Sequence, residues 1–311
     1  MKFLVVGVGA IGSVYLAFLT RKGHEAFGLL KPGRKLEKVR VSGIWGSFEV
    51  DVNTTESLEE LPWEPDVIIL SVKSYDTEEA LKKLSVYVPC DSFIMIAQNG
   101  YGNYEKAVSV FGEERVILSR IIFGSKVVEQ GSVEVTVCAD DVVIGNPAGL
   151  IDESFLKTLA KTFSDAGIPT RYDEEVYKYL WDKIVYNCAL NPLGALFEVN
   201  YGALARNPYT RHMMDEIIEE TFQVMKSAGI ESFWKSASEY KEVFYSKLVP
   251  STASHFPSML EDLRKGRTEI DALNGAVWKI GEEVGVSTPM NEFITKLIKA
   301  KEEFNRNLRR K

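Results

Sequence analysis

The chain has 311 residues, of which 45% are hydrophobic and 26% charged, and its formal net charge is -7. That length gives room for two domains, and the composition is typical of a folded globular protein. The negative charge argues against nucleic acid and against an anionic membrane surface as partners. An anionic ligand would therefore have to be held by local positive charge.

The cysteines and the apolar runs bear on the compartment. Cys90, Cys138 and Cys188 are far apart and form no CxxC pair, which is typical of reduced thiols in the cytoplasm. The three histidines show no metal-ligand spacing, so no metal site is predicted. No basic leader precedes the first apolar run, and no run approaches the roughly 18 residues of a membrane helix. We expect a cytoplasmic protein.

The first segment, KFLVVGVGAIGSVYLAFLTRKGHEAFGLLK, predicts a βαβ unit: strand 2–6, a glycine turn, a helix and a second strand. Helical patterns follow at 76–87 and 101–110. These helices lie between some of the further apolar runs that predict strands, at VRVSGIW, FEVDV, DVIILSV, SFIMIAQNG and RVILSRIIFG. These elements predict one sheet covered by helices.

Two β-rich runs within 130–145, separated by Ala-Asp-Asp, predict a hairpin added to that sheet, with a helix from about 153 and a last strand near 168–172. The sheet is therefore predicted to be mixed. After 174 the β-rich runs disappear and helices are predicted at 174–190, 208–228, 233–246, 258–281 and 290–307. The fold class is α/β: a Rossmann-type dinucleotide-binding domain (1–174) followed by an all-helical C-terminal domain (175–311).

The glycine turn GVGAIG follows the first strand directly and opens the helix. Gly7 permits the tight turn, Gly9 lets a pyrophosphate approach the backbone, and Gly12 allows close helix packing. The alternative is a glycine turn without a ligand. The predicted cofactor-binding residues of this loop are Gly7, Val8, Gly9, Ala10, Ile11 and Gly12.

The end of the second strand indicates which dinucleotide binds. An NAD site would place Asp or Glu there, whereas this strand ends in Leu29, Leu30 and Lys31, with Arg34 close behind. Cations favour a 2′-phosphate, so NADPH is predicted, unless both charges are only solvated. The loops SVKSYD, with Lys73, and AQNGYG, with Asn99, should open at the same sheet edge.

The stretch WDKIVYNCALNPL carries three polar residues four apart. Lys183, Asn187 and Asn191 would lie along one stripe of a helix. A buried lysine beside a cofactor would lose its charge more easily and could protonate a carbonyl oxygen that receives a hydride. Pro192 should end or kink this helix and leave carbonyls unpaired. The alternative is a solvent-facing stripe.

The sequence resembles the 2-dehydropantoate 2-reductase (ketopantoate reductase) family over nearly its whole length. The resemblance rests on GVGAIG, KGHEAFGLLK, SVKSYD, QNGYG, WDKIVYNCALNPLGAL, PSMLEDLRKGRTEIDALNG and GVSTPMNEFI, in this order. It implies reduction of 2-dehydropantoate to (R)-pantoate with NADPH, a step towards pantothenate and coenzyme A.

By matched position, the resemblance implies a role for each motif residue. Lys183 would be the proton donor, and Asn187, Asn191 and Ser258 would bind substrate. Glu269 would contact the cofactor and orient Lys183, while Asn99 would lie between nicotinamide and substrate. Lys31 would meet the 2′-phosphate.

Several of these positions also have a plainer reading or depart from the family pattern. Ser258 with Glu261 would fit a capping box, and Glu269 a solvated charge. Asp271 and Asn274 are read as structural contacts. The family's asparagine before glycine is separated here, as Asn200-Tyr201-Gly202.

The segment SRIIFGS has bulkier residues than the family usually shows, and Ile122 and Phe123 are expected to reshape the pocket. A paralogue acting on another branched 2-oxo acid is therefore the alternative enzyme. A sensor that binds NADPH without turnover is the alternative outside enzymes. Both a monomer and a homodimer fit, with the helices near 208–246 as a possible dimer surface.

Overall fold

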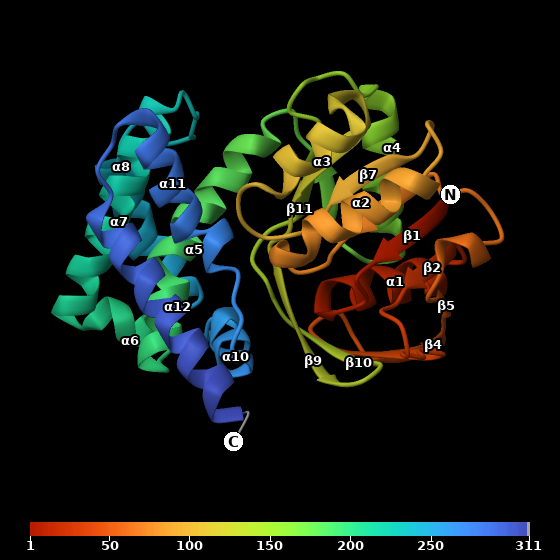
Figure 1. Cartoon of the computed structure of the whole chain (residues 1–311), viewed down its shortest axis with the longest axis horizontal. Coiled ribbons are helices and arrows are strands. Elements are labelled where there is room, and N and C mark those ends of the chain that lie inside the picture. Colours follow the sequence, from red (N-terminus) through yellow and green to blue (C-terminus); the bar gives the residue numbers. More distant parts are fainter. Residues whose placement is uncertain (310–311) are drawn as a thin grey trace. The chain divides into compact units, whose positions relative to one another are not determined.

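The computed structural model describes residues 1–309 and divides into two compact units (Figure 1). Unit 1 comprises Met1–Asn99 and Asn103–Tyr177, and unit 2 comprises Gly100–Gly102 and Lys178–Lys311. The loop Gly100–Gly102 therefore packs with the helical unit although its neighbours in sequence belong to the other.

Unit 1 is built on an eight-stranded mixed sheet. Its strand order is β12 (Thr170–Tyr172), β11 (Val142–Gly145), β8 (Val116–Arg120), β7 (Phe93–Ile96), β6 (Val67–Leu70), β1 (Lys2–Val6), β2 (Glu25–Leu29) and β5 (Asn53–Thr55). All neighbours are parallel except β8 and β11. From β5 to β8 this is the Rossmann order 3-2-1-4-5-6, in which ligands bind where the order reverses, here beside β1 and β6.

Helices cover both faces of this sheet. On one face, α1 (Ala10–Lys22) and α4 (Glu153–Ala166) pack onto alternate strand residues such as Phe3, Val5 and Ile69, all fully buried. The residues between them, including Leu4 and Ile68, face the side of α2 (Thr77–Tyr87) and α3 (Asn103–Phe111). Short helical turns lie at η1 (Leu58–Glu60), η2 (Ser74–Asp76) and η3 (Glu113–Arg115).

A second sheet in unit 1 corrects the predicted hairpin. Its order is β4 (Phe48–Asp51), β3 (Lys38–Gly43), β10 (Ser132–Cys138) and β9 (Phe123–Glu129). The prediction that two runs flanking Ala-Asp-Asp pair with each other is wrong, because β10 pairs with β9 and β3, while β11 pairs with β8 and β12. The true hairpin turns at Gln130-Gly131, where Gly131 has φ +78°. Val39, Val41 and Val133 of this sheet bury against the far side of α1.

Unit 2 is helical. Its elements are α5 (Val176–Phe197, beginning in unit 1), α6 (Tyr201–Arg206), α7 (Pro208–Ser227), α8 (Ala237–Val243), the π-helical turn η4 (Phe244–Leu248), α9 (Val249–Ser251), α10 (Ser258–Lys265), η5 (Ile270–Ala272), α11 (Asn274–Val284) and α12 (Pro289–Arg309). The single helix predicted at 258–281 is wrong: α10 ends at Gly266 in the left-handed region, and the TEID segment forms a turn before α11. The prediction that α5 ends near 190 is also wrong, because it runs through Pro192 to Phe197.

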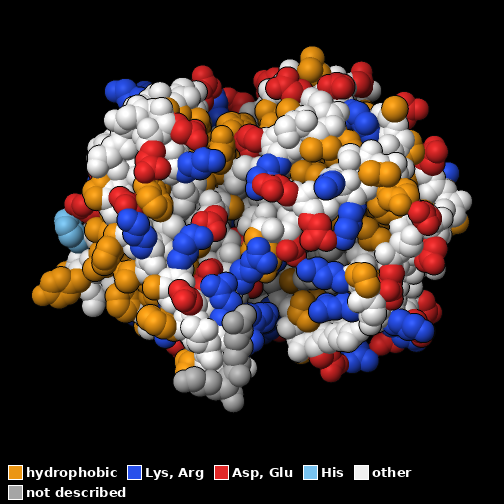
Figure 2. Space-filling model, viewed as in Figure 1, with side chains coloured by type: hydrophobic (Ala, Val, Ile, Leu, Met, Phe, Trp, Pro, Cys, Tyr) orange, Lys and Arg blue, Asp and Glu red, His pale blue; other side chains and the backbone are white. Residues whose placement is uncertain are grey.

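Neither the charges on the visible face nor the helices form a large charged or apolar region. Acidic and basic side chains are interspersed over the visible face (Figure 2). Within residues 1–309, every helix is too short or too polar to cross a membrane.

Candidate active site

The glycine loop of unit 1 is tightly packed at Gly7 and Gly12 and open at Gly9. A Cβ on Gly12 would lie 2.2 Å from the Gly7 carbonyl oxygen, and one on Gly7, whose φ is +93°, would lie 2.7 Å from the Val72 nitrogen. A Cβ on Gly9 would meet no atom within 4 Å. Gly7 and Gly12 are thus required by the fold, whereas the space at Gly9 is left for a ligand.

The N-terminus of α1 suits an anion. Gly9 is its N-cap residue and offers no side-chain hydrogen bond to the first turn, and that turn holds no acidic residue. The backbone N–H groups there are available to a phosphate, as in dinucleotide sites. Ser71 holds the loop in place, because its hydroxyl donates to the Gly7 carbonyl at 2.8 Å. The motif SVKSYD begins with Ser71, but its sequence alone does not predict this contact.

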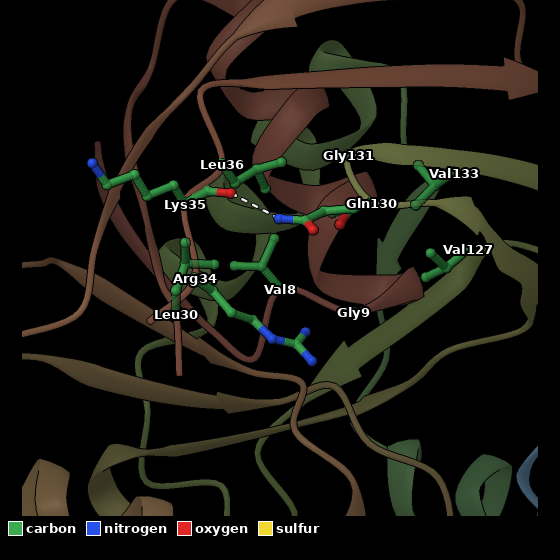
Figure 3. Close-up of a pocket in the computed structure, with 11 residues that line it drawn as sticks. Val8, Gly9, Leu30, Arg34, Lys35, Leu36, Val127, Gln130, Gly131 and Val133 are labelled. Atoms are coloured by element: carbon green, nitrogen blue, oxygen red, sulfur yellow. Dashed lines mark hydrogen bonds between the residues drawn. The ribbon is translucent and has the colours of Figure 1, made fainter. Parts of the chain in front are cut away.

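A cavity of about 340 Å³ adjoins this loop within unit 1. Val8, Gly9 and Ser13 line one side, and the turn of the β9–β10 hairpin, with Gln130 and Gly131, lines another. Gln130 Nε2 donates to the Lys35 carbonyl at 2.9 Å, which ties the hairpin to the segment after β2 (Figure 3). Leu30, Arg34, Leu36, Val127 and Val133 complete the lining with Lys35.

The two candidate phosphate-binding cations lie differently. Figure 3 shows the Arg34 side chain running beside Val8 with its guanidinium directed towards Gly9, while the Lys35 ammonium points away from the other lining residues. Among residues 1–309, the Arg34 side chain has no hydrogen-bond or ion-pair partner. Lys31 is 2.8 Å from Asp76, and its side chain is 71% exposed. Arg34 and Lys35 both belong to the cavity wall, but the ammonium of Lys35 points away from it, and Lys31 stands outside the wall in an exposed ion pair.

The loops after β6 and β7 leave adjacent parallel strands at the same edge, as predicted. Lys73 is the N-cap residue of η2, and Asn99 is partly buried. A hydrogen-bond chain fixes the two loops: Gln98 Nε2 donates to the Val72 carbonyl at 2.8 Å and to Thr77, whose hydroxyl reaches Asn103. Asn103 in turn donates to the Asn99 carbonyl at 2.9 Å. The backbone at Asn99 is thus held by side chains that sequence reasoning did not single out.

The residues after Asn99 join the TEID segment of unit 2. The Tyr101 N–H donates to the Ala272 carbonyl at 2.8 Å, and a Cβ on Gly100 (φ +84°) would lie 2.4 Å from that oxygen. Glu269, half-buried, is the N-cap residue of the same turn, η5. Thr268 beside it is held by the buried Glu302 carboxylate, which accepts from the Thr268 N–H and hydroxyl at 2.6 Å each.

The predicted stripe on α5 has two buried members and one half-buried. Asn187 and Asn191 are 8% and 6% exposed, and Lys183 is intermediate. Asn191 Oδ1 accepts from the Tyr201 hydroxyl at 2.7 Å, which leaves its NH2 group to donate. Within the described residues, the Asn187 amide has no hydrogen-bond partner. This amide is therefore available to hydrogen-bond a ligand.

The aromatic neighbours of the stripe stay protonated. Burial raises the pKa of Tyr201 well above its usual range and that of Tyr186 to about 12. Tyr186 shares a 2.6 Å hydrogen bond with Thr252, and Tyr201 packs against His255, whose pKa is lowered by burial. Tyr201 is therefore a lasting donor to Asn191.

Pro192 does not leave an unpaired carbonyl, contrary to the prediction. In a regular helix the Cys188 carbonyl would accept from residue 192, and proline has no N–H. Asn274 Nδ2 supplies the donor instead, 3.1 Å from the Cys188 oxygen. The same group is 3.0 Å from Asn291 Oδ1, and Asn291 donates to Glu220 at 2.8 Å. Asn274, fully buried, thus connects α5 to α12 as the structural contact that was expected.

Ser258 is exposed and is the first residue of α10. The capping-box reading is wrong, because the N-cap residue is Pro257 and no side chain caps the helix, while Glu261 pairs with Arg264 at 3.1 Å. Ser258 thus stands at a helix N-terminus whose N–H groups no side chain caps, and such a position suits a carboxylate.

The structure also places the residues of the SRIIFGS segment and Asn200. Phe123 does not reshape a pocket: it is 4% exposed and packs in the core, with ring centroids 4.9 Å from Trp45 and 6.3 Å from Tyr15. Ile122 is half-buried. Asn200 caps α6, its side chain accepting from the Ala203 N–H at 2.9 Å.

Comparison with known proteins agrees with this geometry. The family model described as "Ketopantoate reductase PanE/ApbA" matches residues 3–149, and "Ketopantoate reductase PanE/ApbA C terminal" matches 175–302. The chain is 65% identical over 305 residues to the 2-dehydropantoate 2-reductase of Aquifex aeolicus, covering 98% of each chain. The chain belongs to the ketopantoate reductase family. It is an oxidoreductase that acts on a CH–OH group.

More distant relatives share the whole fold. The 2-dehydropantoate 2-reductase of Pyrococcus horikoshii is 32% identical over 97% of this chain and 98% of its own. The PanE/ApbA family ketopantoate reductase of Ralstonia eutropha matches with a TM-score of 0.86 at 25% identity, covering 98% of this chain and all of the other. A D-mandelate dehydrogenase solved with NADH and anilino(oxo)acetate matches with the same score, identity and coverage. Together with the glycine loop, these matches indicate a nicotinamide dinucleotide cofactor for this chain.

Proposed function

We propose that the protein reduces 2-dehydropantoate to (R)-pantoate with NADPH, in the cytoplasm, on the route to pantothenate and coenzyme A. Residues 1–174 would bind NADP, and 175–311 would bind the substrate and carry the catalytic lysine. The observation that carries the proposal is the α5 stripe, where Lys183 is one turn from the unpartnered amide of Asn187. The name of the 65% identical relative supports the substrate.

The proposed cofactor site uses the glycine loop and the cavity beside it. Gly7, Val8, Gly9, Ala10, Ile11 and Gly12 would hold the pyrophosphate at the start of α1. Arg34, in the cavity wall, favours NADPH because its guanidinium can form two hydrogen bonds to a 2′-phosphate. Lys31 would add charge after releasing Asp76. Lys73, Asn99 and Glu269 remain proposed contacts of the rest of the cofactor.

The proposed substrate site divides the work among six side chains. When bound, NADPH supplies the hydride to the C2 carbonyl. Lys183 donates the proton to the carbonyl oxygen as negative charge develops there. Asn187 and the NH2 group of Asn191 donate hydrogen bonds without adding charge, and Ser258 with the N-terminus of α10 binds the carboxylate. Asn99 orients the substrate from the loop after β7, and Glu269 orients Lys183.

A second candidate is the reduction of another branched 2-oxo acid, which the match to D-mandelate dehydrogenase favours. The test is a substrate panel read by NADPH absorbance, with 2-dehydropantoate, 2-oxoisovalerate and phenylglyoxylate at matched concentrations. The proposal predicts the highest kcat/KM for 2-dehydropantoate. A higher kcat/KM for either of the other acids would identify that acid as the better substrate. NADPH binding without turnover of any of the three would support a sensor that binds NADPH without catalysis.

A further inference from the structure

A buried carboxylate on the last helix holds the segment that precedes Glu269. Glu302 of α12 is 6% exposed, and its Oε1 accepts from both the N–H and the hydroxyl of Thr268 at 2.6 Å each. Thr268 is itself 4% exposed. Burying a carboxylate costs free energy unless hydrogen bonds compensate, and bonds to a charged acceptor are roughly twice as strong as neutral ones. The contact between Glu302 and Thr268 is therefore strong and fixed in direction.

The hydrogen bonds of Thr268 reach both sides of Glu269. The Thr268 hydroxyl donates to Glu302 and accepts from the Ile270 N–H at 3.2 Å, so the residues before and after Glu269 are both fixed. Glu269 has φ -98° and ψ 25°, in the sparsely allowed bridge region. Backbone in that region persists where its surroundings hold it, and such residues gather at functional sites. Glu302 thus helps to hold the backbone from which the Glu269 side chain extends.

No regular helix supplies these bonds within the segment. α10 ends at Gly266, which has φ +83°, and η5 begins only at Ile270. The Thr268 N–H lies between the two helical elements, and without Glu302 it would lose the acceptor that a buried N–H needs. α12 can approach this segment because Gly266 has no side chain: a Cβ there would lie 2.6 Å from Arg306 Cγ.

A second buried glutamate shows how such a group usually serves a helix. Glu220 accepts from the Met290 and Asn291 N–H groups at 2.8 and 2.9 Å, in the first turn of α12, where the helix dipole favours negative charge. Glu302 instead binds an irregular segment between two helical elements. Its charge therefore fixes the position of a loop that no helix dipole explains.

We propose that Glu302 is a positioning residue: through Thr268 it fixes the backbone of Glu269 and so holds the carboxylate that orients Lys183. This role rests on the proposed functions of Glu269 and Lys183. Because proton transfer depends on how the lysine is oriented, a displaced Glu269 should lower kcat more than it changes the KM for the 2-oxo acid.

Steady-state kinetics of the full-length protein test this role, with the 2-oxo acid that the wild type reduces best. Glu302→Ala should lower kcat at least about tenfold and change the KM for the acid less than about threefold. Glu302→Gln keeps an acceptor oxygen of the same shape and should retain most of the kcat. Asn305→Ala is the matched control, because Asn305 Nδ2 joins α12 to the Leu263 carbonyl of α10 at 2.7 Å without touching Thr268. Its kcat should stay within about twofold of the wild type.

A double-mutant cycle separates positioning from general support of the fold. Glu302→Ala should lower kcat strongly in the wild type but little in a Glu269→Ala background, because the group that it positions is then absent. Thr268→Val removes the hydroxyl and keeps the N–H, so it gives the same cycle if Glu302→Ala does not fold. Circular dichroism checks the helices of each variant. An equal fold-loss in both backgrounds, an unchanged kcat in Glu302→Ala, or an equal loss in Asn305→Ala would overturn the proposal.

NADPH affinity gives a second cycle that needs no turnover, since Glu269 is also a proposed contact of the cofactor. Glu302→Ala should weaken NADPH binding, read by NADPH fluorescence, in the wild type and have little effect in the Glu269→Ala background. A wild type that reduces none of the 2-oxo acids would contradict the proposed function, and this binding cycle would still decide the role of Glu302. Equal losses of affinity in both backgrounds would then overturn it.

Discussion

Asn274 Nδ2 lies 3.1 Å from the Cys188 carbonyl oxygen, the acceptor that Pro192 leaves without its helical donor. The helix that bears Lys183, Asn187 and Asn191 therefore continues past a proline because another helix completes its hydrogen bonding. This contact explains how α5 stays regular at the point where the stripe ends.

That relationship predicts coupling between two substitutions. Asn274→Ala should lower the free energy of unfolding by about 1–3 kcal/mol, because it leaves a buried carbonyl unsatisfied. In a Pro192→Ala background the loss should be smaller, since the N–H of residue 192 then reaches the Cys188 carbonyl. Chemical denaturation of the four proteins measures the coupling. Strictly additive losses would contradict this role for Asn274.

Alanine substitutions at two positions of the glycine loop should have opposite effects on folding and on cofactor binding. Gly9→Ala should fold normally, because its Cβ meets nothing within 4 Å, and should bind NADPH more weakly because it fills the space left for the pyrophosphate. Gly12→Ala should lose stability, since its Cβ would lie 2.2 Å from the Gly7 oxygen. Thermal melts with and without NADPH separate the two. A Gly9→Ala protein that NADPH stabilises as strongly as wild type would count against this loop as the cofactor site.

Cofactor preference should depend more on Arg34 than on Lys31. Arg34→Ala should raise the KM for NADPH by about tenfold to a hundredfold, the range for one charged hydrogen-bonding group, and leave that for NADH nearly unchanged. Lys35→Ala is the control, because its ammonium points away from the other lining residues (Figure 3). Steady-state kinetics with both cofactors give the comparison. An equal loss with NADPH and NADH would rule out recognition of the 2′-phosphate by Arg34.

Replacing either asparagine of the stripe should lower activity, but only the replacement of Asn191 should also lower the stability of the fold. Asn187→Ala should reduce kcat/KM and leave the free energy of unfolding within about 0.5 kcal/mol, because its amide has no partner in the described protein. Asn191→Ala should reduce both, since the buried Tyr201 hydroxyl loses its acceptor. Kinetics and denaturation on the same preparations decide. Full activity in Asn187→Ala would remove it from the substrate site.

Local sequence patterns predicted the elements that carry the site, and their limits have physical reasons. The Gly7–Gly12 loop and the α5 stripe are set by short-range spacing, which the residues themselves display. The pairing of β10 with β3 joins residues far apart in sequence, such as Ser132 and Arg40. Two adjacent β-rich runs look the same whether or not they pair.

The hydrogen bonds that support the site could not be predicted from the sequence for a similar reason. Nothing local links Asn274 to Cys188, or Gln98 to Thr77, because each pair meets only after the elements pack. Arg34 and Lys31 looked equivalent as neighbouring cations. Only the fold separates the one in the cavity wall from the one paired with Asp76.

The central claim is tested most directly by NADPH oxidation in the presence of 2-dehydropantoate, with wild type and Lys183→Ala measured in parallel. We predict turnover by the wild type and a loss of at least about a hundredfold in kcat for the variant, the usual contribution of a general acid, with NADPH binding retained. A wild type that binds NADPH but leaves 2-dehydropantoate unreduced, or a variant that keeps its kcat, would contradict the account.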